Sequence, residues 1–207
     1  MSQSVVGLVL AGGRSSRFGS EKAVALLDGY PLLLHAHDAL IPHCRMVAVS
    51  AASGSDAERL ANDFGFTVLH DAPGHPRGPL AGVVAGLAWA SAEGADLLAL
   101  APCDTPRMGE AAVGRLIDAL QPGDAITAAV AGGRLHALCA VLRVAAMQPL
   151  TGPLERGEHP PMQALWRSMA LREVAFDDAA PFANVNRPED LDALISEAGL
   201  SARSQRP

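Results

Sequence analysis

Residues 4–22 read SVVGLVLAGGRSSRFGSEK and contain the clearest indication of the fold class. Its first part, Ser4 to Leu10, consists almost entirely of β-branched residues and leucine, the composition of a parallel strand that is buried on both faces. The strand leads directly into a loop of glycine, serine and arginine that ends at Lys22. A buried strand followed by such a loop predicts an α/β sheet with a ligand-binding loop at the carboxyl end of the strand.

The next hundred residues alternate between short apolar strands and helices. Strands are predicted at 46–50, 67–70 and 96–101, and helices at 32–40, 55–64, 80–92 and 110–120. Pro31 stands where the first of these helices begins, and Ser55 or Asp56 is the expected cap of the second. The alternation predicts βαβ units, and therefore a parallel sheet with helices on both faces.

The last third of the chain has a different pattern. Strands at 125–131 and 135–142 flank Gly132-Gly133, a pair that predicts a hairpin with a tight turn. A loop rich in Gly and Pro is expected at 152–161, then a helix at 162–169, a strand at 171–176, a helix at 188–198 with Asn186 as its cap, and a frayed tail at 201–207. Because no linker separates two units, we expect one Rossmann-like three-layer α/β domain over 1–200, mostly parallel, with a late hairpin insertion.

Composition limits the class of protein. Of the 207 residues, 49% are apolar and 18% are charged, so the chain can bury a sizeable core. The net charge of −6 argues against a general nucleic-acid binder. No uncharged apolar stretch approaches the roughly 18 residues that span a membrane, and no basic residue precedes the first apolar segment as in a secretory signal. Three distant cysteines form no disulfide framework, so we expect a cytoplasmic protein without a membrane partner.

The loop at 11–22 has the chemistry of a phosphate-binding loop. Gly12 and Gly13 allow backbone N–H groups to approach a triphosphate closely, and Arg17 and Lys22 add positive charge. Lys22 is the single lysine among 16 basic residues, and an ammonium is a more compact charge than a guanidinium. The loop matches neither a Walker P-loop nor a dinucleotide fingerprint, and a glycine-rich turn without a ligand is the alternative.

A second candidate lies in the sequence PCDTP at 102–106. Asp104 follows a predicted strand, and a carboxylate there can hold Mg²⁺ together with phosphates and water. Alternatively, Asp104 or Thr105 caps the helix that follows. Cys103 has no Cys or His partner at zinc-ligand spacing, so we interpret it as a packing residue.

Several segments together resemble the molybdenum cofactor guanylyltransferases, which belong to the larger nucleoside triphosphate transferase family. They are LAGGRSSRFGSEK at 10–22, Asp71, GPLAG at 78–82, PCDTP at 102–106 and FANVNRPEDL at 182–191. The first segment is typical of the whole superfamily, whereas PCDTP and the Asn-Val-Asn sequence narrow the resemblance. It extends from residue 4 to about residue 195.

The resemblance implies transfer of GMP from GTP to the molybdenum-molybdopterin cofactor, with release of pyrophosphate and with Mg²⁺ as the metal. It leaves room for transient contacts with molybdoenzymes or other cofactor-biosynthesis proteins. Residues 1–120 would bind the nucleotide and 121–200 the acceptor. The implied nucleotide-binding residues are Leu10, Ala11, Gly12, Gly13, Lys22, Ser50, Asp71, Gly82 and Asp104. The implied catalytic residues are Arg17, Lys22 and Asp104, of which Asp104 is also the metal ligand, and the implied acceptor-binding residues are Asn184 and Asn186.

The chain departs from the family pattern at four places. Glu21 replaces an Asp before the loop lysine, Ser50 replaces an Asn at the end of the second strand, and Ala137 replaces a Pro after His136. His159-Pro160-Pro161 stands where basic residues are common. The last two departures lie on the expected acceptor side. No catalytic histidine is expected, because a phosphate nucleophile is already ionised.

Three other functions share parts of this pattern. A molybdopterin cytidylyltransferase would use CTP, but such enzymes usually have Leu-Ala-Ala-Gly where this chain has Leu10 to Gly13. Sugar-phosphate nucleotidyltransferases share the first segment but not the Asn-Val-Asn sequence. A nucleotide-binding regulator without catalysis would not need Arg17, Lys22 and Asp104 together. The resemblance therefore favours GTP.

Overall fold

The computed structural model describes residues 3–12, 21–72, 74–76 and 78–204, and for 197–204 it describes the backbone alone. Its main sheet has seven strands: β1 (Val5–Leu10), β4 (Val47–Ser50), β5 (Thr67–Leu69), β6 (Leu97–Pro102), β7 (Ile126–Ala131), β8 (Arg134–Arg143) and β9 (Leu171–Phe176). The α-helices are α1 (Leu32–Leu40), α2 (Asp56–Asp63), α3 (Pro79–Ala92), α4 (Glu110–Asp118), α5 (Gln148–Glu155), α6 (Met162–Arg167) and α7 (Pro188–Ser204). Short elements complete the fold: β2 (Leu26–Leu27), β3 (Tyr30–Pro31), η1 (Lys22–Val24), η2 (Val144–Ala146) and η3 (Ala180–Phe182).

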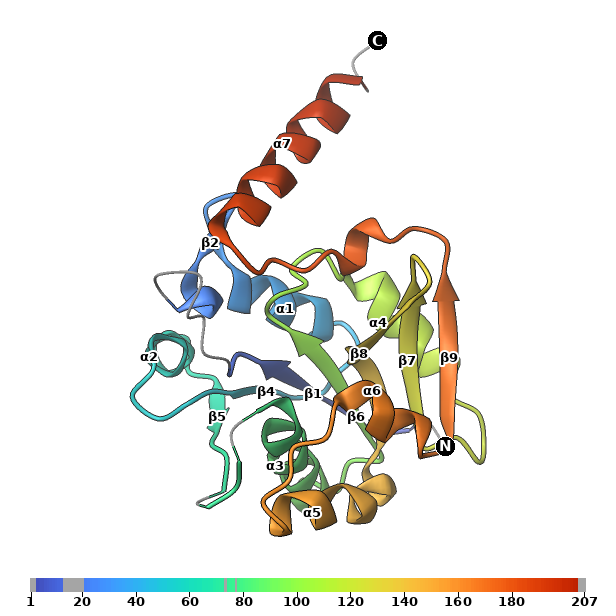
Figure 1. The fold of residues 1–207 in the computed structure, drawn as a ribbon. Helices are drawn as coiled ribbons and strands as arrows, with labels where there is room; N and C mark the ends of the chain where they lie inside the picture. The colour runs from blue at the N-terminus through green and yellow to red at the C-terminus, as the bar shows by residue number, and fades with distance from the viewer. Residues whose placement is uncertain (1–2, 13–20, 73, 77, 205–207) are drawn as a thin grey trace.

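The strand order is β5-β4-β1-β6-β8-β7-β9, and the sheet is mostly parallel (Figure 1). β5, β4, β1 and β6 run in one direction, as expected from the alternating helices. β8 is antiparallel to both β6 and β7, so the predicted hairpin is confirmed and forms part of the main sheet. Gly132 and Gly133 have φ values of 56° and 72°, the left-handed conformation that a two-residue hairpin turn requires.

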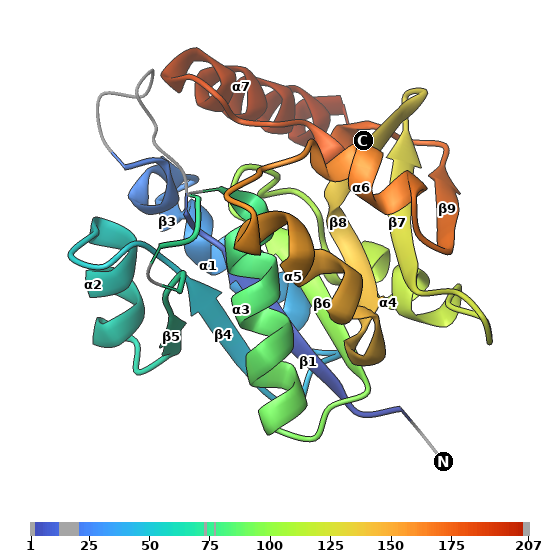
Figure 2. The same cartoon turned by 60° about the horizontal axis from the view of Figure 1, so that its bottom comes forward.

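Helices cover both faces of the sheet, which confirms the three-layer architecture. α1, α2 and α4 pack on one face, and α3, α5 and α6 on the other (Figures 1 and 2). β1 is buried along its whole length because its side chains alternate between the two layers. Val5 and Val9 join the core beneath α1, whereas Val6, Leu8 and Leu10 join the core beneath α3.

The structure corrects three expectations in the last third of the chain. The loop expected at 152–161 is wrong in its first part, because α5 continues to Glu155 with Pro153 inside it. Leu150, Pro153 and Leu154 are buried against the body of the protein, and this packing outweighs the missing N–H of the proline. α7 continues to Ser204, past the expected end at 198 and into the expected tail, whose last residues, 205–207, lie outside the described part.

The expected cap of α7 also has a different role. The side-chain oxygen of Asn186 accepts a hydrogen bond from Lys22 Nζ at 3.3 Å. Asp190, in the first turn of α7, accepts instead from the backbone N–H groups of Asn186 (2.6 Å) and Arg187 (2.9 Å). The start of the helix is therefore satisfied by a carboxylate from inside it.

Within the described residues, no helix combines the length and the apolar character needed to cross a membrane. β1, β4, β5 and β6 all end at the same side of the sheet, which we call the carboxyl side; their beginnings define the amino side. The loops that follow these four strands carry most of the residues predicted for the functional site. Open parallel sheets bind their ligands at this side.

Candidate active site

Lys22, Asp104 and Asn186 meet at the carboxyl side of the sheet. Lys22 Nζ lies 3.6 Å from Asp104 Oδ2 and donates a hydrogen bond to Asn186 Oδ1 at 3.3 Å. The three residues come from the loop after β1, the loop after β6 and the segment before α7. The Lys22 and Asp104 side chains are 15% and 29% exposed, so both are held in place and still reach solvent. This places a cation, a carboxylate and an amide in one group.

Backbone hydrogen bonds hold these segments together. Cys103 N–H donates to the carbonyl of Leu10 at 3.2 Å, which joins the ends of β6 and β1. Val185 N–H donates to the carbonyl of Asp104 at 2.8 Å, which fixes the Asn-Val-Asn segment beside the β6 loop. Because these bonds do not depend on the site side chains, we expect the backbone frame to survive their substitution.

Asp190 shapes the segment that carries Asn186. Its carboxylate accepts from two consecutive backbone N–H groups, and these hydrogen bonds hold the pKa of Asp190 below its usual value. Asp190 therefore stays charged and keeps the turn at 184–187 in one conformation. This role was not predicted from the sequence, where the available signal is a carboxylate four residues after the last Asn.

The predicted nucleotide-binding residues on β1, β4 and α3 are mostly buried. Leu10, Ala11 and Ser50 are 7%, 3% and 5% exposed, so their side chains serve packing and only their backbone can reach a nucleotide. Gly82 lets α3 approach the sheet closely: a Cβ there would lie 2.6 Å from Ser50 Oγ. Gly12 is exposed, with open space where a Cβ would stand, so backbone at this position is accessible to a ligand.

Asp71 is exposed and follows β5 by two residues, at the same side of the sheet. The residue before it, His70, contacts the Ala51 carbonyl through Nδ1 and the Glu58 carboxylate through Nε2, each at 3.0 Å. Glu58 in turn accepts from Gly54 N–H. This network connects the β5 loop to the loop after β4, and it was not predicted from the sequence.

Glu21 has a structural partner instead of a role beside the lysine. Its carboxylate accepts from the backbone N–H groups of Asp56 (2.5 Å) and Ala57 (3.3 Å) at the start of α2. Ser55 caps the same helix through its side chain, as expected. The remaining predicted residues of the first loop, Gly13 and Arg17, lie outside the described residues.

The structure excludes the capping interpretation of Asp104. α4 begins at Glu110 and its cap residue is Gly109, so neither Asp104 nor Thr105 caps this helix. Thr105 Oγ1 donates instead to the carbonyl of Pro102 at 3.2 Å. The Asp104 carboxylate is therefore available for chemistry at the site.

The donor set at Asp104 fits Mg²⁺. In the described part of the chain, no three His, Cys, Asp or Glu side chains gather into a metal-binding group. Mg²⁺ commonly takes only one or two protein carboxylates and completes its coordination with phosphate oxygens and water, so the partly exposed Asp104 suits it. Burial raises the pKa of the neighbouring Cys103 to about 12, which keeps the thiol protonated and supports its interpretation as a packing residue.

On the expected acceptor side, Asn184 is partly buried and precedes the hydrogen bond that fixes Val185. The His136 ring packs against Phe182 with centroids 5.1 Å apart, and Phe182 leads into the Asn-Val-Asn segment. Burial lowers the pKa of His136, which favours its neutral form. His136 therefore packs beside the residue that leads into the Asn-Val-Asn segment.

Solved structures share this architecture. Molybdopterin-guanine dinucleotide biosynthesis protein A from Archaeoglobus fulgidus superposes with a TM-score of 0.77 at 19% identity, covering 94% of this chain and 98% of that one. A nucleotidyl transferase from Methanothermobacter thermautotroptrophicus gives a TM-score of 0.75 at 18% identity, covering 95% and 98%. At such identities the likeness concerns the fold alone, and it defines an α/β nucleotidyltransferase fold.

Sequence comparison identifies the family. The model of the MobA-like NTP transferase domain matches residues 7–172. A molybdenum cofactor guanylyltransferase from Cereibacter sphaeroides is 42% identical over 186 residues, 89% of this chain and 92% of the relative. One from Acidiphilium cryptum is 38% identical and covers 93% of each chain. The chain therefore belongs to the MobA-like NTP transferases and, within them, to the molybdenum cofactor guanylyltransferase family.

Proposed function

We propose that the protein transfers GMP from GTP to the molybdenum-bound molybdopterin cofactor, with Mg²⁺ bound at Asp104. The observation that carries the proposal is the group formed by Lys22, Asp104 and Asn186, three residues that lie far apart in the sequence. Family membership supports guanine as the base and the pterin cofactor as the acceptor. The three cysteines are buried free thiols, which supports the cytoplasm as the place of reaction.

The reaction joins two anions. An oxygen of the terminal phosphate of the acceptor attacks the α-phosphorus of GTP, a new P–O bond forms, and the bond to the β-phosphate breaks so that pyrophosphate leaves. The attacking phosphate is already ionised, and no general base has to remove a proton. The barrier therefore depends on positioning and on stabilisation of the negative charge that develops on the transferring and leaving phosphates.

Different residues of the site bind the phosphates, hold the metal and orient the lysine in this proposal. Lys22 offers a positive charge to the phosphates, and the exposed backbone at Gly12 offers hydrogen bonds to them. A Mg²⁺ ion held by Asp104 would supply Lewis-acid stabilisation of the phosphate oxygens. Asn186 orients the lysine through its amide oxygen, and Asn184 and Asn186 face the acceptor.

The decisive experiment measures pyrophosphate release with GTP or CTP, in the presence of Mg²⁺ and molybdenum-loaded molybdopterin. An established guanylyltransferase run in parallel controls for the quality of the acceptor. We expect release with GTP, at least tenfold faster than with CTP, and its loss when EDTA removes the metal. Release with CTP alone would overturn the guanine assignment and leave the mechanism standing. Binding of GTP without release beside an active control would identify a regulator instead.

A further inference from the structure

The side chain of His159 makes a contact between the two halves of the chain, against Gly78. This residue lies in the segment 156–161, which connects α5 to α6. α5 packs alongside α3 (Figure 2), so the connecting segment passes close to the beginning of α3. His159 is one of the positions where the chain departs from the sequence pattern of its family.

The His159 ring lies directly against Gly78. A Cβ built on Gly78 would be 1.9 Å from His159 Nε2 and 2.6 Å from both Cδ2 and Cε1, distances at which atoms overlap. Gly78 also has a φ of 153°, which disfavours other residues. Two independent features therefore require glycine here, and one of them is the imidazole ring.

Gly78 controls the start of α3. It is the cap residue of this helix, and its carbonyl accepts from Ala81 N–H at 3.1 Å. In the same first turn, Gly82 packs against Ser50 and Leu10, two of the residues predicted to bind the nucleotide. A shift of Gly78 would therefore move the first turn of α3 relative to the nucleotide-binding ends of β1 and β4.

Within the described residues, the polar atom at this contact has no hydrogen-bond partner. Among the residues that the structure describes, His159 Nε2 is the buried side-chain polar atom that lacks a hydrogen bond. Such an atom lowers the stability of the conformation that buries it, so an apolar ring of similar shape would hold Gly78 more firmly. The imidazole ring therefore fills the space beside Gly78 at an energetic cost that an apolar ring would not carry.

We propose that His159 is a positioning residue that acts through Gly78 and reversibly clamps the first turn of α3 in the conformation that receives the nucleotide. The clamp rests on the proposed function for one point, the identity of the nucleotide as GTP. It links the segment 156–161, on the expected acceptor side, to the nucleotide side of the site. A nucleotide can then enter when the ring releases Gly78 and is retained when the contact forms again.

The first test uses amide hydrogen exchange in the first turn of α3, measured without ligand. His159→Ala removes the ring, and we expect exchange there to become about tenfold faster, whereas His159→Phe keeps a ring without the unpartnered nitrogen and should slow it. Glu158→Gln is the matched control, because it changes an exposed neighbour that pairs with Arg156 and should leave exchange unaltered. Equal exchange in the wild type and in His159→Ala would overturn the clamp.

The second test uses GTP. We expect His159→Ala to weaken GTP binding about fivefold with little change in the acceptor KM, and His159→Phe to restore affinity while slowing GTP dissociation. A purely structural role would lower Tm in His159→Ala without changing GTP affinity, and that result would reject the proposal. The wild type could fail to bind GTP while exchange is still slowest in His159→Phe, intermediate in the wild type and fastest in His159→Ala. In that case the proposed function fails and the clamp stands.

A double-mutant cycle tests the contact itself. Gly78→Ala should accelerate exchange in the first turn of α3, because its methyl group overlaps the His159 ring. In the His159→Ala background the same substitution should have a smaller effect, since only the strain of the backbone conformation remains. Fully additive effects would show that the two residues act independently and would overturn the proposal.

Discussion

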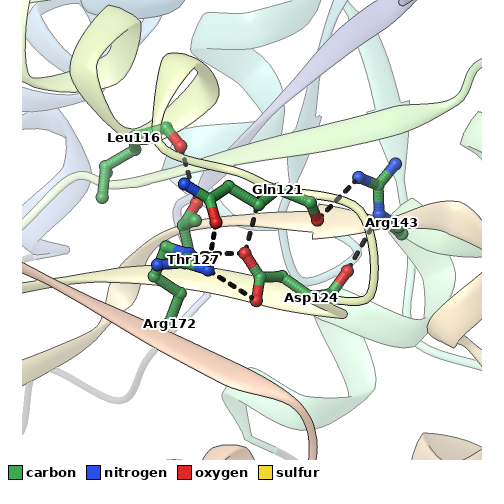
Figure 3. Close-up of polar contacts among 6 residues, drawn as sticks. All are labelled: Leu116, Gln121, Asp124, Thr127, Arg143 and Arg172. Atoms are coloured by element: carbon green, nitrogen blue, oxygen red, sulfur yellow. Dashed lines mark hydrogen bonds and ion pairs between the residues drawn. The ribbon is translucent and has the colours of Figure 1, made fainter.

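The charged side chains at the two sides of the sheet make contacts that differ in length and number. At the carboxyl side, Lys22 and Asp104 are 3.6 Å apart, and the lysine reaches Asn186 at 3.3 Å. At the amino side, Arg172 binds the Asp124 carboxylate at 2.5 Å and 3.3 Å, and binds the side chain of Gln121 at 2.8 Å (Figure 3).

The amino side is a network whose members bind one another. Gln121 N–H donates to the Asp124 carboxylate at 2.8 Å, and Arg143 donates to the backbone carbonyls of Asp124 (2.9 Å) and Gln121 (3.2 Å). A surface hollow lies here, lined by residues that include Asp124 and Arg143. The closeness of these charges does not indicate a binding site, because their hydrogen-bonding groups already hold the ends of β7, β8 and β9 together.

Charged side chains that support the fold differ in geometry from those proposed to act on phosphates. Short contacts with matched geometry make Asp124 and Arg172 a support for the sheet. The 3.6 Å contact between Lys22 and Asp104 is longer than a charge-assisted hydrogen bond, so this pair lacks the matched geometry of Asp124 and Arg172. Substitutions at the two sides should therefore separate activity from stability.

Asp104→Ala should have the largest effect. We expect at least a 100-fold loss of Mg²⁺-dependent pyrophosphate release, because the carboxylate proposed to hold the metal is gone. Tm should stay within about 2 °C of the wild type, since backbone hydrogen bonds hold this loop. Asp104→Asn, which keeps the shape and removes the charge, is the matched control and should be similarly inactive. Near-normal turnover in either variant would remove Asp104 from the metal site.

Lys22→Arg should come next, with a loss of about tenfold to 100-fold in kcat/KM. The charge is kept, but the wide planar guanidinium cannot occupy the space between Asp104 and Asn186 in the same way. Steady-state kinetics with varied GTP measures the effect, and circular dichroism checks the fold. Wild-type kinetics would mean that the single lysine of the chain has no special role.

Asn186→Ala should have a smaller and more selective effect. It removes the oxygen that accepts from Lys22 Nζ, and loss of a hydrogen bond to a charged group corresponds to about a tenfold change. We expect kcat to fall by about this factor, because Lys22 loses the partner that orients it, and the KM for the acceptor to rise. A change confined to GTP binding would instead place Asn186 on the nucleotide side.

Asp124→Asn should leave activity within about twofold of the wild type and lower Tm modestly. Hydrogen bonds from Arg172 and Gln121 hold the pKa of Asp124 below its usual value of about 3.9. Its contribution to stability is therefore present above that value and is lost as the pH falls through the lower pKa of the folded protein. Thermal unfolding between pH 2 and 7 measures this, and the Asn variant should lack that step. A large loss of activity would contradict the proposed division between the two sides.

The fold was largely predictable because it depends on local patterns. Adjacent residues are enough to predict several of its features. These are the buried strand at 5–10, the glycine pair at 132–133 and the alternation of strands and helices. The errors occurred where packing outweighed local preference, as at Pro153 inside α5. The roles of Gly13 and Arg17 stay predictions, because these residues lie outside the described part of the chain.

The α/β class, the family and the types of residue in the site could be read from short, local motifs of the sequence. Which of these residues meet depends on the packing of the whole chain. This packing brought Lys22 to Asn186 across 164 positions, turned Glu21 toward α2 and laid His159 on Gly78. The physical reason is that such contacts follow from how strands order within the sheet and how helices pack on it. These arrangements depend on the whole core and are not encoded in any single segment.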